Sequence, residues 1–241
     1  MIIGSGIKIG NGIAIANDYV APTSYVTSGL VLNFDAGVTG SYPGTGTSWT
    51  DTASSKVGTM GTGVTYSSSN GGVMTFNGTT NAVVTVAGFT SLANNFTLEC
   101  WYQSTNNHPE LWASSTAIGS NGFMMGYYSS SSPANSWKAT KYSVVDIYIG
   151  SIPQNTNWHQ VTYTYSSTAG VSVYVDGVQT GTTYTSTSAN TNLSTSTTNK
   201  IGIGESGNHS GNIGSIRMWN TALSSTQIAQ NFAAVRSKYS I

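Results

Sequence analysis

The chain has 241 residues, and only 7% of them are charged, against about 25% in an ordinary soluble domain. The formal net charge is zero and the lysines and arginines occur singly, which argues against a nucleic-acid partner. Hydrophobic residues make up 38% of the chain, enough for a packed core, so a disordered polar tract is excluded. No apolar run approaches the ~20 residues of a membrane span and no secretory signal is visible, so synthesis in a host cytoplasm is expected and a membrane partner is not.

The N-terminal segment repeats a hexad, Gly-x-Gly-Ile-x-Ile, at residues 4–9 and 10–15. In one extended strand the isoleucines share a face, and the opposite face is nearly bare glycine that another backbone could approach. Two hexads are too few to stack into a solenoid, and a lone strand cannot bury isoleucines in water. The pattern predicts an assembly arm and linker over residues 1–24, completed by other chains or by copies of itself. A strand tucked into the chain's own domain is the alternative. The expected contact residues are Ile3, Ile7, Ile9, Ile13, Ile15 and Gly10.

Short runs of β-branched and aromatic residues, separated by turn residues, follow from residue 25 onward. They predict strands at 30–34, 73–76, 82–86, 96–103, 122–128, 144–150, 159–165, 171–175, 201–204 and 213–219. Many short strands without intervening helices predict an antiparallel sandwich or barrel. Asp176-Gly177 predicts a two-residue type I′ turn after the alternating run 171–175. Residues 104–142 and 185–199 are expected to be rich in loops.

One helix is legible near the C-terminal end of the sequence. Ser224 to Gln227 fits a capping box, and Ile228, Phe232 and Val235 follow at helical spacing. The single cysteine, Cys100, lies in an apolar run, so we expect a buried thiol that acts as a small hydrophobe and forms no internal disulfide.

Five stretches, at residues 29–51, 71–86, 96–103, 157–182 and 211–232, together resemble the laminin-G-like branch of the concanavalin A-like jelly rolls. The resemblance implies an all-β, antiparallel jelly-roll sandwich over residues 25–241, with one short C-terminal helix and an extended N-terminal arm. The first stretch is similar to modules found in structural proteins of tailed bacteriophages. The hexads also look like those of some phage virion proteins, which implies an attachment device.

Some members of this group are β-glucanases whose active strand reads Glu-x-Asp-x-x-Glu. A retaining glycosidase needs two carboxyl groups about 5–5.5 Å apart. The nearest match keeps Asp146 but has Val144 and Ile149 at the two glutamate positions. Glu110 and Glu205 are isolated in the sequence, and the resemblance implies a structural role for the glutamate at position 99. We therefore expect no enzymatic activity, and a glycoside hydrolase is the third alternative.

A cluster of aromatic and amide residues is the candidate for glycan contact, because rings stack on sugars and amides or imidazoles bond hydroxyl groups. Its members are Trp112, Tyr127, Tyr128, Trp137, Asn106, Asn107 and His108. The alternative is that most of these rings belong to the core. His159, at the start of a core strand, is interpreted as a packed or rim histidine.

Calcium is the one cofactor with any candidate residues, since relatives in this group bind it through loop oxygens. Asp35 and Asp51 are the candidates, with Asp176 already explained by its turn. The alternative is that Asp35 and Asp51 tie loops together. His108 and His209 have no His or Cys at metal-ligand spacing.

The leading hypothesis is a non-enzymatic virion structural protein, displayed as a capsid decoration or fibre subunit. Its partners would be other virion proteins and copies of itself, held through the arm, and its location would be the virion. The rival hypothesis is a carbohydrate-binding adhesin that recognises glycans on the host surface.

Overall fold

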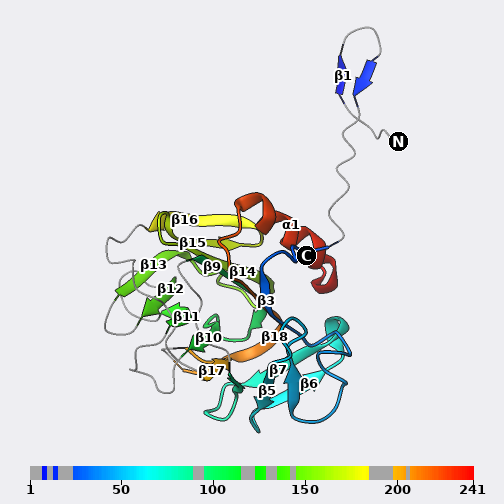
Figure 1. Cartoon of the computed structure of the whole chain (residues 1–241), viewed down its shortest axis with the longest axis vertical. Helices are drawn as coiled ribbons and strands as arrows, with labels where there is room; N and C mark the ends of the chain where they lie inside the picture. Colours follow the sequence, from blue (N-terminus) through cyan, green and yellow to red (C-terminus); the bar gives the residue numbers. More distant parts are fainter. Residues whose placement is uncertain are drawn as a thin grey trace.

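The computed structural model describes residues 7–9, 13–15, 24–88, 95–114, 123–128, 135–141, 145–184, 198–204 and 207–241. Within these ranges most residues belong to antiparallel strands, which form two large sheets packed face to face with a helix against one side (Figure 1). The all-β antiparallel sandwich with one short C-terminal helix is therefore confirmed.

Eight described strands form the first sheet, sheet I, in the order β13-β12-β11-β10-β17-β8-β5-β4. Their bounds are β13 (Val145–Ser151), β12 (Ser136–Lys141), β11 (Phe123–Tyr128), β10 (Glu110–Ser114), β17 (Thr198–Ile201), β8 (Val84–Ala87), β5 (Val57–Met60) and β4 (Ser48–Thr50). β10 and β12 lie inside 104–142, so the loop-rich prediction was wrong there. Polar and small residues dilute the apolar pattern of both strands, and among the described side chains of β12 it is Trp137 and Ala139 that join the core cluster.

The second sheet, sheet II, has the order β16-β15-β14-β9-β18-β7-β6, with β3 also paired to β18. Its strands are β16 (Val178–Tyr184), β15 (Gly170–Val175), β14 (Trp158–Ser166), β9 (Asn95–Ser104), β18 (Ser210–Trp219), β7 (Val73–Asn77), β6 (Val64–Ser67) and β3 (Leu30–Asp35). A 3-10 turn, η1 (Ser69–Gly71), joins β6 to β7. β18 pairs with β9 on one side, and on the other side with β7 first and then β3.

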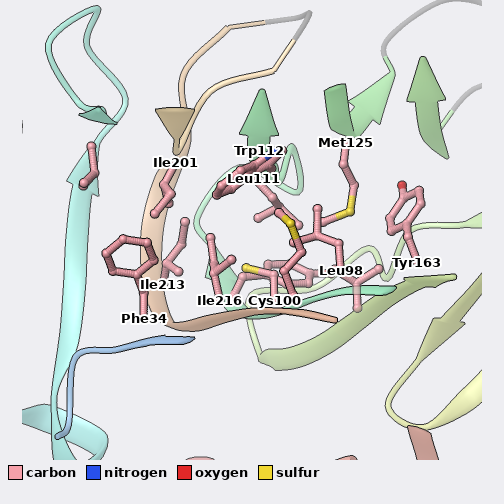
Figure 2. Packing of buried hydrophobic residues seen from close by; sticks show 14 of the residues in the cluster. Phe34, Leu98, Cys100, Leu111, Trp112, Met125, Tyr163, Ile201, Ile213 and Ile216 are labelled. Carbon is pink, nitrogen blue, oxygen red and sulfur yellow. The ribbon is translucent and has the colours of Figure 1, made fainter. Parts of the chain in front are cut away.

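The interior is one large cluster of buried apolar side chains contributed by both sheets. Figure 2 shows Trp112 and Met125 of sheet I packed over Leu98 and Cys100 of sheet II. Cys100 is fully buried, and burial raises the pKa of its thiol well above the usual value. The prediction of a buried cysteine is confirmed.

Two edge strands, β13 of sheet I and β16 of sheet II, bring the sheets into backbone contact. Gly150 and Gly181 lie at this contact with φ values of 63° and 68°. A Cβ atom on Gly181 would lie 2.6 Å from the amide nitrogen of Gly150. Glycine is required at Gly181 both by its left-handed backbone and by the close approach.

The C-terminal helical segment consists of α1 (Ser225–Val235) and the 3-10 helix η2 (Arg236–Tyr239), and it packs on the outer face of sheet II (Figure 1). Among the described residues, no helix has the length and apolar character needed to cross a membrane.

The capping box predicted for this helix is confirmed. The backbone N–H of Gln227 donates to Ser224 Oγ (3.3 Å), and the Ser224 N–H donates to Gln227 Oε1 (2.9 Å). On the helix face toward the sheet, Ile228 is buried and Phe232 stacks on Trp101 with 5.7 Å between ring centroids.

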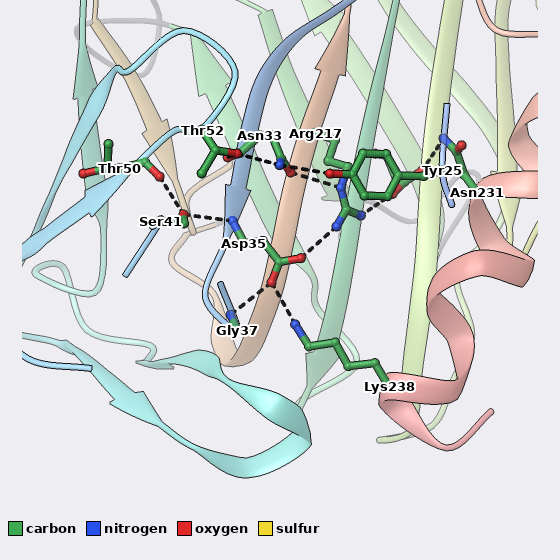
Figure 3. A network of polar contacts seen from close by, with 11 residues as sticks. Tyr25, Asn33, Asp35, Gly37, Ser41, Thr50, Thr52, Arg217, Asn231 and Lys238 are labelled. Atoms are coloured by element: carbon green, nitrogen blue, oxygen red, sulfur yellow. Dashed lines mark hydrogen bonds and ion pairs between the residues drawn. The ribbon is translucent and has the colours of Figure 1, made fainter. Parts of the chain in front are cut away.

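A buried polar network lies between sheet II and the C-terminal helical segment (Figure 3). Arg217 of β18 donates to Asp35 Oδ2 (2.8 Å), Glu99 Oε1 (3.0 Å) and Asn33 Oδ1 (3.1 Å). Lys238 Nζ donates to the other oxygen of Asp35 (2.8 Å). Two carboxylates and two cations therefore balance one another, and the structural role expected for Glu99 is confirmed.

The N-terminal hexads form a small sheet of their own, in which β1 (Ile7–Ile9) pairs antiparallel with β2 (Ile13–Ile15). The register places Ile7 opposite Ile15, Lys8 opposite Ala14 and Ile9 opposite Ile13. The expected single extended strand was therefore wrong. A hairpin pairs backbone groups that a lone strand would leave to water.

Candidate functional site

One end of the sandwich gathers the loops after β9 and β13 and the turn after β15. The side-chain amide of Gln103, near the end of β9, donates to the carbonyl oxygen of Thr156 (2.9 Å) and so ties this strand to the loop after β13. The Ile152 N–H donates to the carbonyl oxygen of Asn135 (2.9 Å). We call this end the rim and define it as residues 104–109, 135, 152–157, 159 and 176–177.

The rim holds part of the predicted glycan cluster. The ring of His108 is exposed and stacks flat on Tyr127, with 4.0 Å between centroids and 9° between planes. Asn106 Oδ1 accepts from the His108 N–H (3.0 Å), and Asn107 has a positive φ of 59°. The Tyr127 hydroxyl donates to Asn135 Oδ1 (3.4 Å). The structure thus brings His108, Asn106 and Asn107 together on a fixed loop above one tyrosine.

The two tryptophans of the predicted glycan cluster do not lie with these residues at the rim. Trp112 and Trp137 are 1% and 0% exposed and belong to the core cluster, so their ring faces are covered by other side chains. Trp137 pairs with Tyr127 and Ile149 across the sheet, and all three point inward. Their assignment to glycan contact was therefore wrong. The side chain of Tyr128 lies outside the described residues.

A second polar cluster at the rim centres on His159. Its Nδ1 lies 2.7 Å from Asp176 Oδ2, and its Nε2 lies 2.9 Å from Asn155 Oδ1. The other oxygen of Asp176 accepts from the Gln160 N–H (2.9 Å). Asp176 and Gly177 both have positive φ, which confirms the predicted turn. The carboxylate therefore shapes the turn and also orients an imidazole.

The sequence did not reveal this pairing or the part played by Asn135 and Asn155. His159 and Asp176 lie 17 positions apart, and they meet because β14 and β15 pair in one register. No local motif links the two residues, and the sequence pattern does not supply the β14–β15 register that brings them together.

The two calcium candidates are engaged with protein groups. Asp51 accepts hydrogen bonds from the backbone of Asn33, Ala53 and Ser54 and from the Ser54 hydroxyl. Asp35 is held by Arg217 and Lys238. Calcium needs six to eight oxygen ligands with available lone pairs, which these carboxylates do not offer. Within the described ranges no three His, Cys, Asp or Glu residues group closely enough to hold a metal ion. Both aspartates tie the structure together, and the calcium assignment does not fit them.

The carboxylates considered for a glycosidase site lie in different parts of the chain. Asp146 pairs with Thr140 in the sheet I register, and its side chain lies outside the described residues, as do Val144 and Glu205. Glu110 is buried at the start of β10. Beside its bond to Arg217, Glu99 accepts from Asn231 Nδ2 (3.0 Å).

The assembly arm is described only in part. Ile7, Ile9, Ile13 and Ile15 lie in β1 and β2, whereas Ile3 and Gly10 lie outside the described residues. The four described isoleucines occupy ladder positions of the same parity.

Comparison with known sequences places the chain in a family. The profile of the concanavalin A-like lectin/glucanases superfamily matches residues 76–229, which is more than half of the chain. The chain belongs to this superfamily. No curated protein sequence matches it.

Solved structures with the same architecture come from larger proteins. The chain resembles a sialidase of Trypanosoma rangeli (TM-score 0.61, 17% identity, 90% of this chain and 35% of that one). It also resembles the binding domains of a paraclostridial mosquitocidal protein (0.63, 12%, 85% and 52%) and of botulinum neurotoxin serotype G (0.61, 14%, 84% and 50%). The chain spans between about a third and a half of these proteins. At such identities the likeness shows the fold alone.

Proposed function

We propose that the chain is a non-enzymatic structural protein of a virus particle, which displays the sandwich and attaches through its N-terminal arm. The resemblance of the hexads to those of phage virion proteins supports a tailed phage, with the chain as a capsid decoration or fibre subunit. One observation carries the proposal: the hairpin register sets Ile7 against Ile15 and Ile9 against Ile13 in a sheet of two described strands.

A two-stranded hairpin is marginally stable by itself in water. Fully burying each isoleucine is worth about 1.5–3 kcal/mol, so added strands or an apolar partner surface would stabilise the arm substantially. Strand addition by neighbouring subunits supplies both. The partners we propose are other virion proteins and further copies of this chain, and the proposed location is the virion.

Substitution in the hairpin tests the attachment. Ile9→Asp should prevent incorporation into particles, because a carboxylate replaces an isoleucine that the arm needs to bury. Lys8→Thr, at the opposite parity, is the matched control and should be incorporated normally. The measurement is copies per purified particle, beside circular dichroism of the free chain. Normal incorporation of Ile9→Asp would show that the sandwich, and not the arm, makes the contact.

A carbohydrate-binding adhesin is the second candidate, and the rim favours it. His108 presents an imidazole on the buried Tyr127, flanked by the amides of Asn106 and Asn107. Rings and amides on a fixed loop are suited to sugar hydroxyls and sugar faces. Two of the similar structures are described as binding domains, which agrees with a binding role for this fold.

A glycan array probed with the full chain tests this candidate. Binding that His108→Ala abolishes and Thr168→Ala preserves would support the rim, because Thr168 is exposed in the turn at the other end of β14. Absence of binding to any glycan would contradict the adhesin proposal and would not affect the proposed structural role.

We also propose that the chain has no glycosidase activity, since apolar residues replace both glutamates of the expected motif around Asp146. Incubation with laminarin, lichenan and agarose should release no reducing ends. Turnover that disappears in Asp146→Asn would overturn this.

A further inference from the structure

The segment where the arm joins the sandwich lies against the C-terminal helix. We name residues 24–26 the arm root. The Val26 N–H donates to Asn231 Oδ1 (2.8 Å), and Gln230 Nε2 donates to the carbonyl oxygen of Ser24 (3.1 Å). From β18, Trp219 Nε1 donates to the carbonyl oxygen of Val26 (2.8 Å). Two neighbouring side chains of α1 therefore hold the backbone of the arm root, 205 positions earlier in the sequence.

Tyr25 is the central residue of the arm root. Its ring lies 4.3 Å from the guanidinium carbon of Arg217, and its hydroxyl accepts from Asn33 Nδ2 (3.2 Å) (Figure 3). It also packs against two small apolar clusters on the outer face of sheet II. The first cluster is Val73, Trp101, Trp158, Val235 and Tyr239, and the second is Tyr174, Trp219, Leu223 and Ile228. Since Val235 belongs to the first cluster and Ile228 to the second, Tyr25 packs against both clusters that α1 helps to form.

Asn231 links the arm root to the buried charges. Its Oδ1 accepts from the arm root, and its Nδ2 donates to Glu99, which in turn binds Arg217. Lys238 of η2 completes the set through Asp35. The same few side chains thus satisfy the arm root, the helix and the sheet, so removing one element leaves polar groups of the others unpaired.

The layer under the C-terminal helical segment contains buried polar side chains without hydrogen-bond partners among the described residues. Gln160 and Thr162 are fully buried, and within the described ranges neither side chain has a hydrogen-bond partner. Gln160 is the cross-strand neighbour of Trp101, and Thr162 is that of Glu99. Both therefore lie beside residues that α1 covers. Buried polar groups without partners weaken the docking of the element above them, and such elements open before the core does.

We infer that the arm root and the C-terminal helical segment, residues 225–239, dock on sheet II as one cooperative unit. Docking of the arm root is then coupled to docking of the helix, and by linkage each changes the other by the same factor. The biological meaning of this coupling rests on the proposed role of the arm. The coupling itself is a property of the free chain and is tested there.

Hydrogen–deuterium exchange of the full chain tests the inference. Tyr25→Ala should speed exchange of the amides at 229–235 at least tenfold, while the amides of β9 and β14 keep their wild-type protection. Thr27→Ala is the matched control, because Thr27 is exposed two positions further along, and it should change nothing. Unchanged exchange in α1, or acceleration shared equally by β9 and β14, would overturn the inference.

The reverse direction provides a second measurement. Asn231→Leu removes the acceptor for the Val26 N–H, so chymotrypsin should cleave after Tyr25 at least tenfold faster than in the wild type. Thr226→Ala, exposed on the same helix, should cleave at the wild-type rate. Equal rates for the two variants would contradict the coupling. Because neither test involves particles, failure of the coupling and failure of virion attachment are distinguishable.

Discussion

Charged residues are scarce in this chain, and the structure buries at least six of the sixteen. The buried set is Asp35, Asp51, Glu99, Glu110, Lys138 and Arg217. A buried charge is tolerated only when it is paired or hydrogen-bonded, so these residues hold parts of the interior together. We therefore expect substitutions of these buried charged side chains to change the free energy of unfolding more than substitutions of surface ion pairs.

Arg217 is the most demanding of these residues. Arg217→Met would leave Glu99 and Asp35 without the cation between them, and breaking such a buried pair costs about 3–5 kcal/mol. We expect urea unfolding to show a loss of this size. Lys200→Met, at a partly exposed position, is the control and should stay near wild type. Equal stability of the two variants would contradict the role assigned to the network.

His209 makes stability depend on pH. It is fully buried against Phe76, and burial lowers its pKa from 6.5 to about 4, against smaller opposing effects from the backbone of Asn212 and Gln103. The unfolded state therefore binds a proton first. The contribution of neutral His209 is fully present above pH 6.5 and is lost as pH falls toward 4, by up to about 3 kcal/mol.

Chemical denaturation between pH 7 and pH 4 measures this slope. His209→Leu should flatten it, because leucine has no proton to bind. A variant with the same decline as wild type would assign the pH dependence to other groups.

The roles of some residues could be predicted from their neighbours in the sequence, and the roles of others could not. The Asp176-Gly177 turn followed from backbone preference, and the burial of Cys100 followed from its apolar neighbours. Trp112 and Trp137 were misassigned because both were expected in loops, whereas they belong to strands β10 and β12 and are buried in the core. The His159–Asp176 pair needed a strand register that no local pattern supplies.

At the scale of elements, signals confined to a few neighbouring residues were reliable. The capping box at Ser224 and Gln227 correctly predicted the start of α1. The hexads were misread as one strand because parity alone cannot distinguish a continuous strand from one that turns back. β10 and β12 were missed because polar and small residues dilute the apolar pattern of both strands.

The contact between β13 and β16 gives an element-scale prediction. Gly181→Val places a branched side chain at a φ of 68°, with its Cβ against the Gly150 backbone. The backbone strain alone is worth about 1–3 kcal/mol, and the clash adds to it. Thermal unfolding should show a clear drop in Tm. Gly40→Ala is the control, since nothing lies within 4 Å of a Cβ atom there. A Tm for Gly181→Val equal to that of the control would refute the tight contact.

At the scale of the whole molecule, the sandwich architecture was predictable because many short strands without helices leave few alternatives. The order of strands within the sheets was not predictable from periodicity, since β18 pairs with β9, β7 and β3 from distant parts of the chain. The contact between the arm root and α1 was equally unpredictable, because it joins residues 205 positions apart in the sequence.

Truncation distinguishes the arm from its root. Removing residues 1–23 should leave the thermal transition within a few degrees, equivalent to about 1 kcal/mol or less. Removing residues 1–27 also deletes Tyr25 and Val26 and should lower the transition markedly further. Calorimetry of both truncated chains measures the two transition temperatures. A large loss on removing only residues 1–23 would mean that the arm is an integral part of the sandwich.

We propose that the arm attaches the chain to a particle. The most direct test is to fuse residues 1–24 to an unrelated monomeric fluorescent protein and count the fusion in purified particles, beside the chain truncated to residues 24–241. We expect the fusion to be incorporated and the truncated chain to be absent. Incorporation of the truncated chain without the fusion would contradict it, and would place the attachment on the sandwich.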